Sequence, residues 1–140
     1  MRRLVITILV LALFSMVSAH GQNKTSEIDS LLALLPGLEG VKLIDAYLDL
    51  SENYLYVTPV KTIEYAERAM KLVAATEWSD RICHANLLIG TGLISTGEFA
   101  QGEKYVVQGL AQARQLNNAR YISIGLSALA AYHMNTGNYD

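Results

Sequence analysis

Cysteine, clustered basic charge and strand-like patterns are all scarce in this chain of 140 residues. The single cysteine, Cys83, excludes an intramolecular disulfide framework. The 11 Lys and Arg residues are outnumbered by 13 Asp and Glu residues, and nucleic-acid binding needs a clustered basic surface, so no nucleic-acid partner is expected. Apolar and polar residues do not alternate as they do in strands. An apolar fraction of 51% therefore predicts a core of packed helices.

A long uncharged run lies at the N-terminus. Two arginines precede the run from Leu4 to Val17 and small residues follow it, so residues 1–21 are predicted to be a secretory signal peptide. Cleavage before Gln22 is favoured over cleavage before His20, although both fit the small-x-small rule. A permanent membrane anchor is the alternative, but spanning a bilayer takes ~20 apolar residues and this run is shorter. We expect an exported protein of the periplasm or cell envelope, with no membrane insertion by the mature segment.

Helical periodicity covers the rest of the chain. Residues 22–37 predict a linker followed by an N-terminal capping helix, which starts at Ser26 and ends at Pro36-Gly37. Helices of this length with short connections must run antiparallel to their neighbours. Further helices are expected at about 40–56, 60–76, 81–95, 98–116 and 119–135.

Particular residue types are expected at the helix ends. Gly97 and Gly137 stand where a chain leaving a helix favours a left-handed residue, which glycine adopts without strain. Asp80 and either Asn117 or Asn118 precede predicted helices and are candidates for N-caps.

A period of forty residues organises the helical region. The turn sequence Ser95–Phe99 returns as Asn135–Tyr139, which predicts consecutive copies of one helix–turn–helix unit. The last copy lacks its second helix, so we expect the chain to belong to a longer product. The copies are expected at about 40–79, 80–118 and 119–140.

The repeats resemble the tetratricopeptide repeat (TPR) family, in the long variety of about 40 residues found in bacterial sensor and regulator proteins. Asn86, Gly102 and Gly109 depart from the residues usual at their positions. The resemblance implies an all-α fold over residues 38–140: a right-handed α-solenoid of antiparallel helix pairs, or TPR-like superhelix. In the middle copy the positions that correspond to the family pattern are Asn86, Ile89, Gly90, Leu93, Gly97, Phe99, Gly102, Val106 and Gly109.

In the TPR family the first helices of the pairs line a concave groove that holds a partner. The resemblance implies that the middle and third copies line this groove with His84, Leu87, Thr91, Ile94, Ser95, Ile124, Ser127, Ala131, Met134 and Asn135. The first copy would add Asp45, Leu48, Glu52, Leu55 and Tyr56. These positions hold no Lys or Arg, so we expect a protein or peptide partner with apolar anchors instead of one held by its carboxylate. Leu87→Glu is expected to abolish partner capture without changing helical content.

Catalytic motifs are lacking, so we expect no enzyme and no cofactor. The leading interpretation is a protein–protein interaction module, the sensory or scaffolding region of a longer envelope signalling protein. A self-associating adaptor that pairs through its open C-terminal end is the first alternative. A metal or redox site at Cys83 and His84 is a remote alternative, because adjacent helical residues point ~100° apart.

Two side-chain patterns have a structural and a functional interpretation. Asp45, Asp49 and Glu52 lie at i, i+4 and i+7 and form one acidic face. A solvated surface is the favoured interpretation of this face, and contact with a cation or a basic peptide is the alternative. Stacking across the seam between helices, in preference to a binding box, is expected of Tyr47, Tyr54, Tyr65, Tyr105 and Tyr121.

Overall fold

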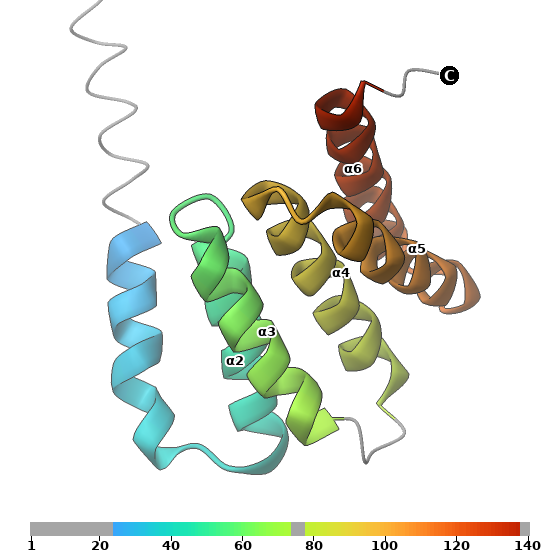
Figure 1. Cartoon of the computed structure of the whole chain (residues 1–140). Coiled ribbons are helices and arrows are strands. Elements are labelled where there is room, and N and C mark those ends of the chain that lie inside the picture. The colour runs from blue at the N-terminus through green and yellow to red at the C-terminus, as the bar shows by residue number, and fades with distance from the viewer. Residues whose placement is uncertain (1–23, 74–77, 138–140) are drawn as a thin grey trace, which may run out of the picture.

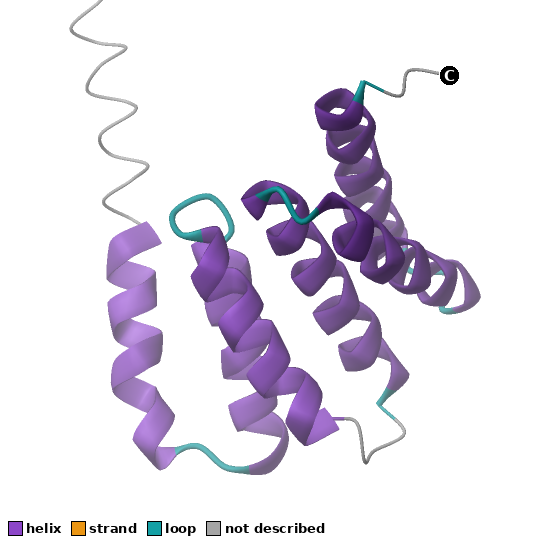
Figure 2. Ribbon diagram, viewed as in Figure 1, coloured by secondary structure: helices purple, strands orange, loops and turns teal. Residues whose placement is uncertain are grey.

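The computed structural model describes residues 24–73 and 78–137, and this part of the chain is all-helical, with no strand (Figures 1 and 2). The predicted all-α class is therefore confirmed. The first helix covers residues 24–34 and continues into a short 3-10 helix, Leu35–Gly37. The others are α2 (Gly40–Tyr54), α3 (Pro59–Val73), α4 (Ser79–Thr96), α5 (Phe99–Gln115) and α6 (Ala119–Thr136).

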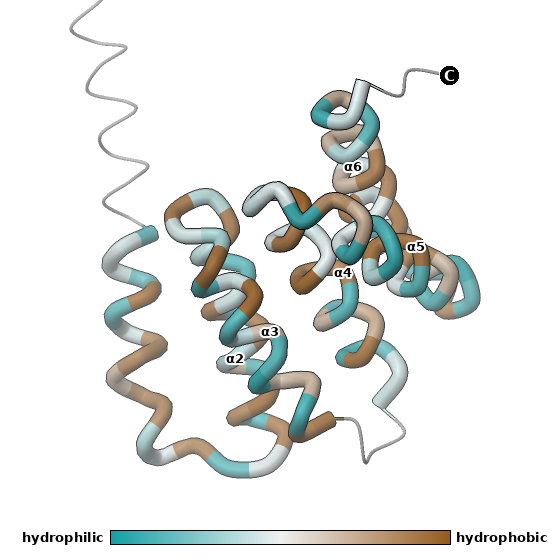
Figure 3. The backbone as a smooth tube through the Cα atoms, viewed as in Figure 1, coloured by the Kyte–Doolittle hydropathy of each residue, from teal (hydrophilic) through white to brown (hydrophobic). Residues whose placement is uncertain are grey.

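The predicted signal peptide, residues 1–21, lies outside the described residues. Within the described part of the chain, no helix is long and apolar enough to cross a bilayer. Figure 3 shows hydrophobic and hydrophilic residues interspersed along each described helix, as expected when one face of a helix is buried and another is solvated.

The expected ends of the helices are mostly confirmed. Gly97 and Gly137 follow α4 and α6 in the left-handed conformation, with φ of +90° and +74°. Asn118 is the N-cap of α6, and its side-chain oxygen accepts the backbone N–H of Tyr121 at 3.1 Å. The prediction for Asp80 is wrong: α4 begins two residues before the expected start, so Asp80 lies in its first turn.

Helix α4 is the centre of the packing. It lies against α3, α5 and α6 and also touches α2, so it is enclosed on several sides (Figure 1). Every residue from Cys83 to Gly90 is buried as a result. A helix buried on most of its faces has to be apolar or small nearly all round, and α4 meets that requirement.

Tyrosines fill part of the seam around α2 and α3. Tyr65 of α3 is buried, and its ring stacks on Tyr54 with centroids 5.6 Å apart and lies 6.0 Å from Tyr47. Tyr105 packs against the central core, while Tyr121 stacks on His84 with centroids 4.9 Å apart. The expected stacking across helix seams is therefore confirmed for the tyrosines of α2, α3 and α6.

Helices α4 and α5 approach each other closely at their glycines. A β-carbon placed on Gly90 would lie 2.8 Å from both the carbonyl oxygen of Gly102 and the backbone nitrogen of Val106. One placed on Gly109 would lie 2.8 Å from the side chain of Leu87. Because these separations are shorter than any tolerated contact, the two backbones can meet only where side chains are absent.

We therefore expect Gly90→Ala to destabilise the fold by about 1–3 kcal/mol, since the added methyl group forces two backbones apart. Gly37→Ala is the matched control, because a β-carbon there meets nothing within 4 Å. The control should change the free energy of unfolding by less than about 0.5 kcal/mol. Urea denaturation followed by circular dichroism measures both values, and equal stabilities for the two variants would contradict the close contact.

Candidate functional site

A groove of about 790 Å³ lies between the first helix, α2, α4 and α6. Its lining is mixed: apolar and small polar side chains alternate with a few charges. The apolar lining consists of Leu31, Leu34, Leu55, Tyr56, Leu88, Ile124, Ala128 and Ala131. The uncharged polar lining consists of Ser26, Ser30, Asn53, Thr91, Ser95, Ser123 and Ser127. The charged lining consists of Lys24, Glu27, Asp49 and Glu52.

Half of the residues predicted for the groove in the middle and third copies do line it. They are Thr91, Ser95, Ile124, Ser127 and Ala131. From the first copy, Glu52, Leu55 and Tyr56 are also in the lining. Small side chains of α4 and α6, such as Thr91, Ser95 and Ser127, form one side of the groove.

The other predicted positions lie elsewhere, because more of α4 is covered than the sequence pattern implied. Leu87 and Ile94 are core residues, 0% and 4% exposed, and they pack against the glycines of α5. His84 is also buried, at 5% exposure. Met134 and Asn135 are exposed near the end of α6, outside the lining.

Two predicted positions of the first copy are also corrected. Leu48 belongs to the central core. Asp45 forms a two-point ion pair with Arg81 of α4, at 2.7 and 2.9 Å, and does not line the groove.

The structure changes the expected effect of Leu87→Glu. Leu87 has no exposed surface and contacts the backbone face of Gly109 and the face of Gly125. A glutamate at this position would bury a charge without a partner, which destabilises the fold. Leu87→Glu would therefore lower helical content and could not report on binding alone.

The sequence did not indicate the wall formed by the first helix. A helix was expected from Ser26 to Pro36-Gly37, but no sequence signal showed which elements it would contact. Its apolar stripe packs on α2 through Ile28 and Leu31, and this contact brings Ser30 and Leu34 to the groove. The apolar stripe itself was the available sequence signal, because an amphipathic helix packs its apolar face against another part of the protein.

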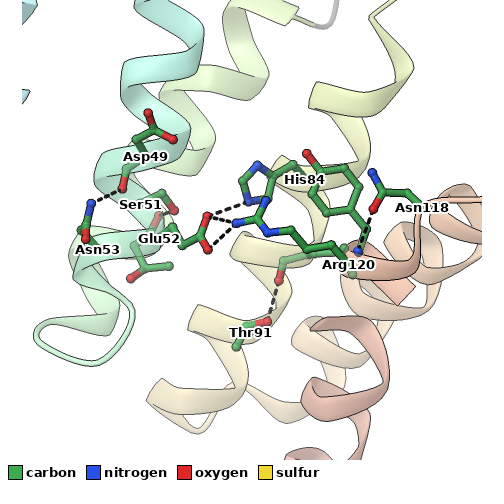
Figure 4. Close-up of polar contacts among 11 residues, drawn as sticks. Asp49, Ser51, Glu52, Asn53, His84, Thr91, Asn118 and Arg120 are labelled. Atoms are coloured by element: carbon green, nitrogen blue, oxygen red, sulfur yellow. Dashed lines mark hydrogen bonds and ion pairs between the residues drawn. The ribbon is translucent and has the colours of Figure 1, made fainter. Parts of the chain in front are cut away.

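A polar network joins α2, α4 and α6 beside the groove (Figure 4). The guanidinium of Arg120 donates to both carboxylate oxygens of Glu52 at 2.6 and 2.7 Å. On the other side of Glu52, Nε2 of His84 lies 3.4 Å from the carboxylate, and the ring of Tyr121 stacks on the imidazole. Glu52 of α2 therefore contacts side chains from both α4 and α6.

The network shifts the pKa values of its carboxyl groups in opposite directions. The N–H of His84, followed by that of Arg120, lowers the pKa of Glu52 from 4.5 to about 2, against the opposing effect of burial. One turn earlier, burial and then the nearby charge of Glu52 raise the pKa of Asp49. The two neighbouring acids thus differ because Glu52 is paired and Asp49 is not.

Cys83 and His84 do not share a site. The Cys83 thiol is buried and donates to the carbonyl of Gly109 at 3.3 Å, while the imidazole of His84 faces Glu52. Burial raises the pKa of Cys83 to about 11, so the thiol stays protonated at neutral pH. In residues 24–73 and 78–137, no group of three or more His, Cys, Asp or Glu side chains is placed to hold a metal ion.

No family model, curated protein or solved structure matches this chain. The function of the groove therefore has to be argued from its own residues and geometry.

The Glu52 contacts predict a measurable titration. Because its pKa is lowered in the folded chain, the paired carboxylate stabilises the fold above pH 4.5, and this contribution is lost as the pH falls toward 2. Carboxyl ¹³C NMR should give Glu52 a midpoint of about 2. Arg120→Gln should raise that midpoint, and Arg114→Gln, on the exposed end of α5, should not. A midpoint near 4.5 in the unmodified chain would show that the network does not form.

Proposed function

We propose that this protein is a non-catalytic interaction module, which holds a segment of a partner protein in the groove between its first helix, α2, α4 and α6. The observation that carries the proposal is the mixed lining of this groove, in which exposed small side chains surround apolar ones. A volume of about 790 Å³ is within the range of ~300–1,000 Å³ typical of ligand sites. Apolar anchors on a helix or an extended segment are the occupants that such a surface suits.

The proposal includes a right-handed, TPR-like solenoid of antiparallel helix pairs. Gly97 and Gly137 lie forty residues apart and both follow a helix in the left-handed conformation, which supports this repeated arrangement. The position of the groove supports it too, since three of its four walls are the helices that the repeat register assigns as first helices, namely α2, α4 and α6.

We also propose that the module is exported and acts in the periplasm or cell envelope, as the sensory or scaffolding region of a signalling protein. The basic and apolar pattern of residues 1–21 supports export. Two ion pairs join α2 to helices distant in sequence, and they support a rigid scaffold. Asp45 binds Arg81 of α4, and Glu52 binds Arg120 of α6.

A site-specific photo-cross-linker tests the proposed groove. We expect the cross-linker at Ser127, an exposed lining residue, to give one discrete adduct with a protein in the native host. The same group at Gln108, exposed on α5 and outside the lining, is the control. Filling the groove with Ala131→Trp should remove the Ser127 adduct.

Adducts of equal yield from both positions, or an adduct that persists in the filled groove, would contradict the proposed function. Circular dichroism of each variant separates loss of binding from loss of fold.

A further inference from the structure

Four polar side chains of the groove, Ser30, Asn53, Thr91 and Ser95, present hydrogen-bond acceptors. The hydroxyls of Ser30, Thr91 and Ser95 donate to backbone carbonyls one turn earlier in their own helices, at 2.8, 2.7 and 2.9 Å. Each hydroxyl proton is thus already used, and the oxygen lone pairs remain available to a ligand. The Asn53 amide likewise donates to the carbonyl of Asp49 at 3.1 Å, so its oxygen remains as an acceptor.

Asp49 adds a negative charge to this lining. Two arginines of neighbouring helices are paired with other carboxylates of α2, since Arg81 binds Asp45 and Arg120 binds Glu52. Figure 4 shows the Asp49 carboxylate pointing away from the contact between Arg120 and Glu52. Partial burial and the neighbouring Glu52 raise the pKa of Asp49, and a cation beside it would reverse that effect.

Nearby positive charges offset Asp49 only in part, because His84 and Arg120 lower its pKa but burial and the charge of Glu52 outweigh them. Lys24, the cation in the lining, lies over the ring of Tyr56 with its nitrogen 4.9 Å from the centroid, and Glu27 lies on the same helix. Arg120 lies outside the lining and offsets Glu52. The lining therefore has an excess of negative charge and of acceptor atoms.

We infer that the groove selects a partner segment in which apolar residues flank a single arginine or lysine. The apolar residues would cover the leucines and alanines of the lining, and the cationic side chain would place its N–H donors beside the Asp49 carboxylate. This inference rests on the proposed function, because it specifies the partner of the same groove. A segment with an acidic residue at that position would be rejected by like charge.

Two labelled peptides test the inference. The first is a fluorescein-labelled dodecapeptide of leucine, alanine and serine with one central arginine. The second replaces that arginine by citrulline, which has the same shape without the charge. Fluorescence anisotropy with the full chain should show about fivefold tighter binding of the arginine peptide, the upper range for a solvent-exposed ion pair. About 0.5 M salt should reduce this ratio.

Matched variants assign the preference to one carboxylate. Asp49→Asn should bring the affinity ratio of the two peptides close to one. Glu67→Gln makes the same change in net charge on an exposed position of α3, outside the lining, and should leave the ratio unchanged. Circular dichroism confirms that both variants are folded.

The outcomes separate the inference from the proposed function. If both peptides bind equally and Ala131→Trp weakens both, the groove binds apolar segments and the cationic preference is overturned. If neither peptide binds, or if Glu67→Gln lowers the ratio as much as Asp49→Asn, the inference is also overturned. The cross-link from Ser127 reports on the groove independently of the charge of the partner.

Discussion

The direct contact between the backbones of α4 and α5 is the constraint on which the remaining structure depends. Gly90 faces Gly102 and Val106 at a distance that leaves no room for a methyl group, and Leu87 closes over Gly109 one turn away. This contact fixes the depth of α4 in the molecule. Because α4 is held so deeply, α3 and α6 can both pack against it, and its residues from Cys83 to Gly90 are all buried.

The groove is a consequence of that enclosure. With most of α4 covered, only a narrow strip that includes Thr91 and Ser95 faces the space between the first helix and α6. Ion pairs and stacked rings hold the walls around this strip: Glu52 connects α2 to both α4 and α6 through His84 and Arg120. The same pairing leaves Asp49, one of the acidic residues of the lining, without an ion pair among the described residues.

The sequence predicted the helices and their ends well, because these depend on local signals. The left-handed glycines at 97 and 137 and the cap at Asn118 are such signals. The orientation of individual side chains on α4 was harder to predict. Leu87 and Ile94 were assigned to the groove from the repeat pattern of the family. They are buried because Gly109 and Gly102 of α5 let that helix pack directly against them. The first helix was missed as a wall, since nothing local to residues 24–34 encodes which distant surface it covers.

The contact of α4 with α5 can be measured directly by NMR. The α-protons of Gly90 lie against the backbone of Val106, so the packing predicts a nuclear Overhauser effect between a Gly90 α-proton and the Val106 amide proton. A strong cross-peak in the folded chain is the expected result. If resolved resonances of both residues show no such cross-peak, the helices do not meet at their glycines, and neither the burial of α4 nor the groove follows.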